Sequence, residues 1–176
     1  MHLEYLNLEH KEQFLDLIND EDIKYYISAF NDEEETIIEK LRDINQDKSV
    51  GTAYAIIDNG KLVGYLSSKR SVHLYHKIYS HVEILHEEPY AELLQKSPFI
   101  IDIAIHREFR ERGLAKAAIA LILEKHRSLG NVEAVYFEIN TKNAQSIKLV
   151  KGLGGEWIYD YDYFEDFVSI YEFRFF

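Results

Sequence analysis

The segment IDIAIHREFRERGLAKAAIALILEKH, Ile101 to His126, joins an apolar run to a predicted helix through a cluster of arginines. Its first residues continue an apolar run that starts at Phe99, which is typical of a strand buried on both faces. After a cluster of arginines and a Gly-Leu-Ala turn it continues as a helix, predicted over 113–127. The first N–H groups of a helix lack intrahelical partners and carry a partial positive charge, so such a junction often binds an anion.

The junction itself, Arg107 to Ala117, has the composition of a phosphate site. Gly113 lets the backbone approach a ligand closely, and Ala115 is small enough for close packing. In an otherwise acidic chain, this segment has more basic than acidic residues. The basic residues are Arg107, Arg110, Arg112 and Lys116, and the acids are Glu108 and Glu111. This contrast favours a polyanion such as a pyrophosphate. The alternative is an exposed helix start with solvated arginines, and neither the P-loop pattern nor G-x-G-x-x-G is present.

Around this junction, strands and helices alternate along the chain. Periodicity and capping residues predict a strand at 1–6, a helix from Glu9, and a helix over 31–44 capped by Asn31 or Asp32. The Asn59-Gly60 turn predicts a hairpin at 52–68, and an insert with some helix follows at about 71–98. The chain continues with a strand at 99–105, the helix at 113–127, a strand at 132–139, a short helix at 143–155 with Asn143 as its candidate N-cap, and an antiparallel pair at 156–176. The order predicts an α/β (α+β) fold in which helices flank a single mixed, mostly antiparallel sheet. The length of 176 residues predicts one domain over 1–176.

The composition narrows the setting and the partners. There is no cysteine, and the chain starts without a basic flank followed by an apolar core, so we expect a cytoplasmic protein without a signal peptide or disulfides. No apolar run is long enough to span a membrane. The net charge of −11 opposes binding to nucleic acid or to an anionic membrane and favours cationic amines as ligands, although acids also simply aid solubility.

Two motifs together resemble a known family. The segment Arg110-Glu-Arg-Gly113-Leu-Ala115 is similar to [RQ]-x-x-G-x-[GA], the acetyl-CoA-binding motif of the GNAT superfamily of N-acetyltransferases. Downstream, NTKNAQSIKLVKGLGGEW is similar to the second motif of the branch written N-x-x-S-x-x-[VL]-x-x-x-x-G-F. Its matching positions are Asn143, Ser146, Leu149 and Gly154. The order of the predicted elements resembles the family over nearly the whole chain.

The resemblance implies acetyl-CoA as the co-substrate and assigns residues to it. In this family the strand before the loop separates from its neighbour, and its backbone binds the pantetheine arm, here through Ile103, Ala104 and Ile105. Backbone N–H groups at the helix start would hold the pyrophosphate. These belong to Arg110, Glu111, Arg112, Gly113, Leu114, Ala115 and Lys116. Asn143 and Ser146 would contact the cofactor beyond the separated strands.

The implied reaction is acyl transfer from a thioester to an amine, which needs a base and an acid. Many family members use as the acid a tyrosine that follows the position of Leu149, where this chain has Val150. Ser146 offers a hydroxyl instead, unless it only caps or packs its helix. The candidate bases are Asp102, on the central strand, and Glu165, in the last turn. The alternatives are a buried, hydrogen-bonded Asp102, a solvated Glu165, and a water chain acting as the base.

The remaining features concern the acceptor. The segment EWIYDYDYFEDF mixes tyrosines with acids, which suits a cationic amine, or else it is an ordinary strand with acids on its wet face. The four histidines of the insert, His73, His76, His81 and His86, are followed by two glutamates but match no metal motif. We therefore expect no metal site and interpret the insert as a loop that shapes the acceptor site.

The sequence leaves three functions open. The first is a catalytic N-acetyltransferase acting on a small amine or a peptide N-terminus. The second is a non-catalytic sensor of the same fold that binds CoA, which Val150 supports. The third is an interaction domain without CoA. The exposed final strand could also pair between subunits and form a homodimer.

Overall fold

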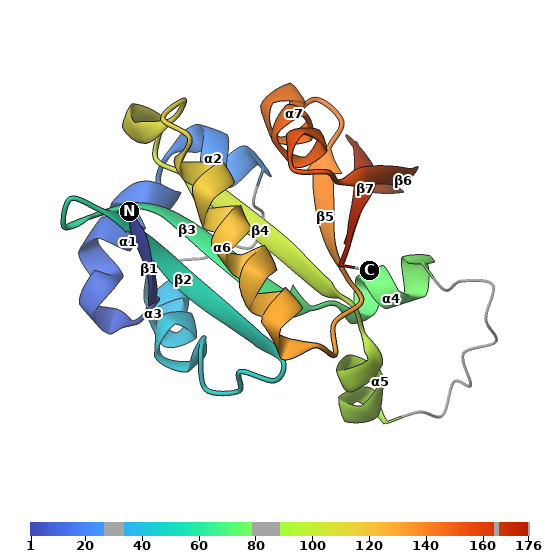
Figure 1. The fold of residues 1–176 in the computed structure, drawn as a ribbon. Helices are drawn as coiled ribbons and strands as arrows, with labels where there is room; N and C mark the ends of the chain where they lie inside the picture. Colours follow the sequence, from blue (N-terminus) through green and yellow to red (C-terminus); the bar gives the residue numbers. More distant parts are fainter. Residues whose placement is uncertain (27–33, 79–88, 164–165, 176) are drawn as a thin grey trace.

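The computed structural model describes residues 1–26, 34–78, 89–163 and 166–175. One seven-stranded sheet, in the order β1-β2-β3-β4-β5-β7-β6, forms the centre of this part of the chain (Figure 1). All neighbouring strands pair antiparallel except β4 and β5, which run parallel. This confirms the predicted mixed, mostly antiparallel sheet. The strands are β1 (His2–Tyr5), β2 (Gly51–Asp58), β3 (Lys61–Arg70), β4 (Phe99–Ile105), β5 (Ala134–Asn140), β6 (Glu156–Tyr163) and β7 (Asp166–Arg174).

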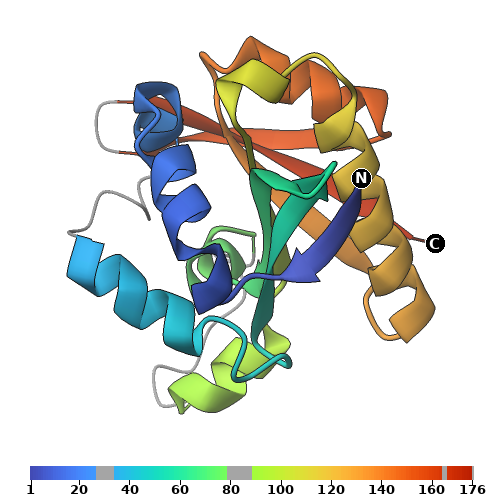
Figure 2. The same ribbon diagram turned by 90° about the vertical axis from the view of Figure 1, so that its left-hand side faces the viewer.

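Helices cover both faces of the sheet (Figure 2). On one face α6 (Leu114–Leu129) and α7 (Ala144–Gly152) pack on a core that includes Leu66, Ile101 and Phe137. On the other face lie α1 (Lys11–Ile18), α2 (Glu21–Tyr26) and α3 (Glu34–Asp43), over a second core beneath β1 to β3. A third cluster joins α4 (Val72–Ile78) to β4, β5 and β7 on that same face.

The predicted hairpin around Asn59 and Gly60 is confirmed. Their φ angles are +51° and +76°, as a type I′ turn requires at both central positions. β3 continues from this turn and pairs with β4 over its whole length, from Gly64 opposite Ile105 to Arg70 opposite Phe99. The hairpin therefore fixes the register of the strand that leads to the arginine–glycine junction.

The helical prediction missed one helix, and parts of it concern residues outside the described ranges. Helix α2 was not predicted, because six residues are too few to show a helical period. The predicted cap at Asn31 or Asp32 falls outside the described residues. The insert holds α4 and a further helix, α5 (Tyr90–Lys96). Residues 79–88, with His81 and His86, also lie outside the described part.

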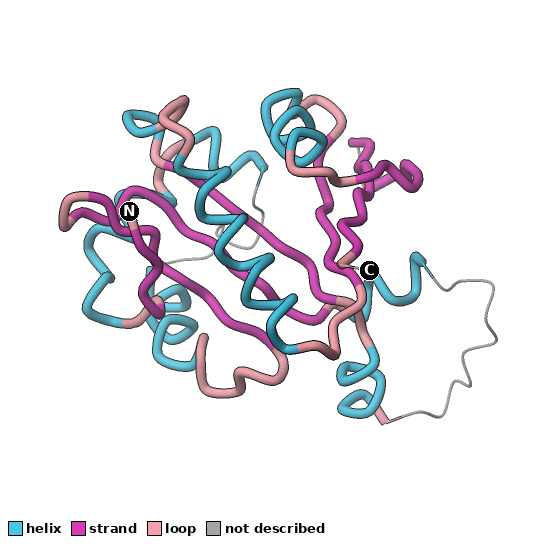
Figure 3. The backbone as a smooth tube through the Cα atoms, in the orientation of Figure 1, coloured by secondary structure: helices cyan, strands magenta, loops and turns pink. Residues whose placement is uncertain are grey.

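Strands β4 and β5 pair only at their first residues. The register joins Phe99 to Val135 and Ile100 to Tyr136, and no pair follows. Beyond these positions β4 stays on β3, while β5 pairs with β7 as far as Asn140. The two strands therefore separate toward their carboxyl ends (Figure 3). This leaves the edge of β4 that faces β5 without strand partners after Ile100.

Candidate active site

A cleft of about 920 Å³ lies where β4 and β5 have separated. One wall is the end of β4 with the junction that follows it, and the other is the first part of α7. Its lining includes most of the residues that the sequence assigned to a cofactor, namely Ile103, Ala104, Ile105, Arg110, Glu111, Gly113, Leu114, Ala115, Lys116, Asn143 and Ser146. Arg112 is the one assigned residue that does not line the cleft. Two segments that are separated by 25 residues, between Lys116 and Lys142, thus meet at one opening.

The start of α6 presents unpaired N–H groups to this cleft. Gly113 precedes the helix with a φ of +76°, and no side chain caps it. A Cβ added at Gly113 would meet no atom within 4 Å, so the space beside it is open. Glu111 also has a positive φ, +63°, which is rare for a residue with a side chain and marks a strained loop. Open space and helix N–H groups together suit a phosphate group.

The arginines of the junction shape the loop more than they line the cleft. Arg110 Nε donates to the Ile105 carbonyl at 3.0 Å, and its guanidinium lies 3.6 Å from the Asp20 carboxylate. Arg112 donates to the Glu108 carbonyl at 2.8 Å. Arg110 and Arg112 therefore hold the backbone of the loop whose N–H groups face the opening, while Arg110 and Lys116 also line the cleft.

Much of the positive charge in the cleft comes from lysines that the sequence analysis did not single out. Lys142, just before α7, and Lys148, in α7, line the wall opposite Lys116. The ammonium of Lys142 also lies 2.5 Å from the Asp166 carboxylate, which offsets part of its charge. Lys142 and Lys148 flank Asn143 and Ser146 of the second motif, and this position in the sequence was the signal that could have identified them. Together with the N-terminus of α6 they make the opening suitable for a polyanion.

The second motif builds the α7 wall. Asn143 caps the helix, as predicted, because its side chain accepts a hydrogen bond from the Ser146 N–H at 3.1 Å. Ser146 is itself not the cap, and it is half-buried in the lining of the cleft. Val150 is buried in the core beneath α7 with Tyr171, so no side chain from position 150 reaches the opening.

Two carboxylates lie on the face of the separated strands that points away from α6 and α7. In β4, Ile101 packs toward α6, so its neighbour Asp102 points to the other face. In β5, Phe137 packs toward α6, and Glu138 points away in the same manner. Asp102 and Glu138 therefore share one face, on the two strands that border the opening. Sequence analysis missed Glu138, although its place between Phe137 and Ile139 in a buried strand gave the signal.

The surroundings of the two acids differ. Asp102 accepts a hydrogen bond from Ser67 Oγ at 3.2 Å, and the Lys69 ammonium lies 3.1 Å from its Oδ2. Glu138 Oε1 accepts a hydrogen bond from the Tyr161 hydroxyl at 2.8 Å. Burial raises the pKa of Glu138, an effect that the Tyr161 hydrogen bond partly offsets and that the nearby Asp102 increases.

The mixed tyrosine and acid segment divides between two faces. Tyr159 and Tyr161 pack with the cluster under α4, on the side of Glu138. Asp160 points the other way and accepts hydrogen bonds from Ser169 Oγ and from the Trp157 ring. Strand alternation explains this division, because neighbouring side chains of a strand point to opposite faces. Of the two interpretations of this segment, the ordinary strand with acids on its solvent-exposed face agrees better with this arrangement. Glu165 lies outside the described residues.

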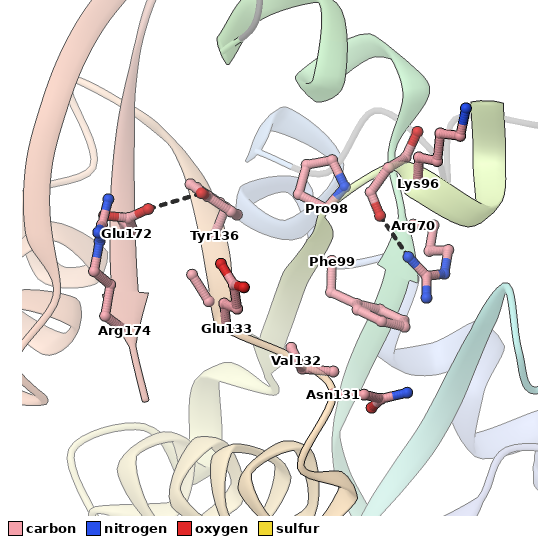
Figure 4. A pocket seen from close by; sticks show the side chains of 12 residues that line it. Arg70, Lys96, Pro98, Phe99, Asn131, Val132, Glu133, Tyr136, Glu172 and Arg174 are labelled. Atoms are coloured by element: carbon pink, nitrogen blue, oxygen red, sulfur yellow. Dashed lines mark hydrogen bonds and ion pairs between the residues drawn. The ribbon is translucent and has the colours of Figure 1, made fainter. Parts of the chain in front are cut away.

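A second cavity, of about 450 Å³, lies at the closed end of β4 and β5 (Figure 4). Its charged groups largely bind each other or the backbone. Arg70 donates to the Ser97 carbonyl at 2.7 Å, and Glu172 accepts a hydrogen bond from the Tyr136 hydroxyl at 2.7 Å. The residues that line this cavity do not include the start of α6, so the features that suit a phosphate group belong to the first cleft.

Two further findings concern the described residues alone. None of their histidine, aspartate and glutamate side chains gather in a group of three that could hold a metal ion. No helix in residues 1–26, 34–78, 89–163 and 166–175 is both long and apolar enough to cross a bilayer.

Comparison with solved structures identifies the same fold in known enzymes. The aminoglycoside acetyltransferase AAC(6')-Ib, solved with paromomycin and acetyl-CoA, is 14% identical with a TM-score of 0.73, over 98% of this chain and 92% of that one. A chimera of the spermidine N-acetyltransferase SpeG from Vibrio cholerae and hSSAT is 13% identical with a TM-score of 0.71, over 99% of this chain and 96% of that one. An acetyltransferase from Salmonella typhimurium that modifies the N-terminal serine of ribosomal protein L7/L12 is 11% identical with a TM-score of 0.72, over 98% and 93%.

Comparison of the sequence with curated proteins finds no match. The model of the acetyltransferase (GNAT) family, by contrast, matches residues 14–154, which include both motifs and the separated strands. The match spans most of the chain and agrees with the motif resemblance and with the fold. The chain therefore belongs to the GNAT family of acetyltransferases.

Proposed function

We propose that this protein transfers the acetyl group of acetyl-CoA to a primary amine. The observation that carries the proposal is the separation of β4 from β5 after Ile100, directly beside the uncapped N-terminus of α6, in a chain of the GNAT family. The separated strands offer an extended polar edge, and the helix offers an anion site. Acetyl-CoA carries a pyrophosphate and an amide-containing arm, which match these two features.

The residues of the first cleft would hold acetyl-CoA. The backbone N–H groups from Arg110 to Lys116 face the space beside Gly113, where a pyrophosphate fits. The freed edge of β4 at Ile103 to Ile105 would bind the pantetheine amides. Asn143 and Ser146 would form the opposite wall, and the cleft lysines would balance the phosphate charge.

Glu138 and Asp102 would accept the proton that the acceptor ammonium must lose. A general base works best when its pKa lies near the working pH, and burial moves the pKa of Glu138 in that direction. Asp102 shares its face and would attract the ammonium. The free amine then attacks the thioester carbonyl, and Ser146 Oγ would donate a hydrogen bond to the departing sulfur. The Tyr161 hydroxyl holds Glu138 in place.

The acceptor class is an amine that is cationic in water. The structurally similar enzymes act on an aminoglycoside, on spermidine and on a protein N-terminus. In this chain two carboxylates face the acceptor side, and the basic groups Lys69, His73 and Lys77 lie around them. A small amine or a peptide N-terminus with limited positive charge fits this balance better than a long polycation.

Two measurements on the purified protein test the proposal. Calorimetric titration with acetyl-CoA and with CoA should give micromolar binding. Release of free thiol from acetyl-CoA should then rise on addition of one of three probe amines: spermidine, kanamycin or a short peptide with an N-terminal serine. Absence of binding to both CoA species would refute the proposal.

A non-catalytic CoA sensor is the second candidate, favoured by the burial of Val150 where many relatives carry a tyrosine. Such a sensor would bind acetyl-CoA but release no thiol with any amine. The variants Ser146→Ala and Glu138→Gln separate the two functions. In an enzyme they should lower turnover while leaving acetyl-CoA affinity within a factor of about three.

A further inference from the structure

Lys69 places an amine of the chain itself on the acceptor side of the site. Its Nζ lies 3.1 Å from Asp102 Oδ2, and its side chain is 49% exposed. The ion pair thus holds the ε-ammonium of Lys69 beside one of the two carboxylates that we propose as proton acceptors.

The sheet register produces this arrangement. Ser67 lies opposite Asp102 and Lys69 lies opposite Ile100, so the side chains of Ser67, Lys69 and Asp102 point to the same face of the sheet. Lys69 is a diagonal neighbour of Asp102, and a long side chain spans that distance easily. Ile100 is also the last residue of β4 that pairs with β5. The lysine therefore lies level with the point at which the opening begins.

We propose that Lys69 is acetylated by acetyl-CoA bound to the same molecule. This inference rests on the proposed function, which places the pantetheine arm along Ile103 to Ile105. Ile103 lines the cofactor cleft, whereas the side chain of Asp102 points to the other face of the same strand and does not line it. A thioester that passes between the separated strands beyond Ile103 would emerge at that other face, where the Lys69 amine is held against Asp102.

The step needs only acetyl-CoA as co-reactant. Asp102 takes a proton from the Lys69 ammonium, and the freed electron pair on Nζ attacks the thioester carbonyl carbon. The tetrahedral intermediate collapses with cleavage of the C–S bond. The sulfur leaves with the bonding electron pair and takes up a proton, which gives CoA and Nε-acetyl-Lys69.

The modification would change the site. Acetylation removes the positive charge of the lysine, so it also removes the counter-ion of Asp102. Ser67 Oγ would remain bonded to the carboxylate. The Asp102 carboxylate would then be available to the ammonium of an external acceptor. Self-acetylation would in this way break the Lys69–Asp102 ion pair and leave Asp102 able to bind the cation of an external acceptor.

The test is mass spectrometry of the full chain after incubation with acetyl-CoA, with peptide mapping of the acetylated lysines. Lys69 should gain one acetyl group at a rate that saturates with acetyl-CoA and does not depend on protein concentration. Lys69→Arg should remove the modification. Asp102→Asn should slow it by about 100-fold, the size of a general-base contribution. Lys61→Arg is the matched control, because Lys61 lies exposed at the start of the same strand, and it should change nothing.

Calorimetry on the same sample separates the possible failures. If acetyl-CoA binds but Lys69 reacts no faster than exposed lysines such as Lys61, the inference is wrong and the proposed function stands. If the rate rises with protein concentration, the transfer runs between molecules and the intramolecular proposal is overturned. If acetyl-CoA does not bind, the proposed function fails first, and this inference fails with it.

Discussion

The Tyr161 hydroxyl donates a hydrogen bond of 2.8 Å to Glu138 Oε1, and this bond joins the final hairpin to the strand that borders the opening. The two residues come from β6 and β5, which are separated in the sheet by β7. Both side chains reach the face where Asp102 lies. This hydrogen bond fixes a half-buried carboxylate at the place where we propose that the acceptor amine loses its proton.

Replacing Glu138 by Gln should therefore reduce turnover without loss of the cofactor site. Gln keeps the shape and can still accept the Tyr161 hydrogen bond, but it cannot take a proton. We expect kcat for the best probe amine to fall by about 100-fold. Acetyl-CoA affinity, measured by calorimetry, should stay the same. Tyr161→Phe should lower kcat by a smaller factor, since it only frees the glutamate.

The same substitution should raise stability at neutral pH. Burial raises the pKa of Glu138 above its ordinary value of 4.5, so the folded state disfavours the ionised form. The free energy of unfolding is then reduced once the pH exceeds the unfolded pKa, and the loss grows until the pH passes the folded pKa. Glu138→Gln should unfold at a higher temperature than the natural chain at neutral pH. The two melting temperatures should converge below pH 4.5, and equal values throughout the pH range would contradict the raised pKa.

His126 should make stability depend on pH in the acid range. The ring is buried and lies 2.7 Å from Ser68 Oγ through Nε2, and burial lowers the pKa of His126 from 6.5 to about 4. The unfolded chain takes up a proton below pH 6.5, while the folded chain does not. Stability is therefore complete above pH 6.5 and decreases as the pH falls toward about 4, by up to about 3 kcal/mol.

The variant His126→Gln checks this dependence. Gln can bond Ser68 but does not titrate, so the fall in the free energy of unfolding between pH 6.5 and about 4 should become shallower. The variant should be less stable near neutral pH, because it loses the ring contact with Phe99 at a centroid distance of 4.8 Å. An unchanged slope in urea unfolding experiments at several pH values would assign the dependence to other groups.

Gly113 and Gly130 provide a matched pair at the two ends of α6. Their φ angles are +76° and +68°, and a Cβ at either would meet no atom within 4 Å. Ala at either position should lower the free energy of unfolding by about 1 kcal/mol, because of the left-handed backbone. Of these two glycines, Gly113 lines the cofactor cleft and Gly130 does not. Gly113→Ala should weaken acetyl-CoA binding by tenfold or more, about 1.4 kcal/mol, whereas Gly130→Ala should bind normally.

Ser146→Ala tests the assignment of the thiol donor. If Ser146 Oγ assists the departing sulfur, kcat should fall by about 10-fold to 100-fold with unchanged acetyl-CoA affinity. Helix α7 should keep its stability, because the capping bond uses the Ser146 backbone N–H and the side chain of Asn143. Asn143→Ala is the control for a lost cap and should lower stability by about 1 kcal/mol.

Sequence alone determined the features that depend on local patterns. A continuous apolar run located β4, the residues after the Gly-Leu-Ala turn located α6, the Asn59-Gly60 turn located the hairpin, and Asn143 was recognised as a helix cap. The two motifs identified the family because they record backbone requirements, such as the positive φ at Gly113, that few residues can satisfy. These requirements lie within a few consecutive residues, so they are visible without the fold.

Tertiary structure decided what depends on the register and separation of strands. The pairing of β3, β4, β5, β7 and β6 determines which charged side chains share a face with Asp102. Glu138 and Lys69 lie on that face, and Asp160 points to the other one. The opening itself exists because β5 leaves β4 after Ile100 to follow β7, a choice made between strands distant in the chain. The sequence of a strand shows which of its side chains lie on the same face, but the register with neighbouring strands determines which groups those side chains contact.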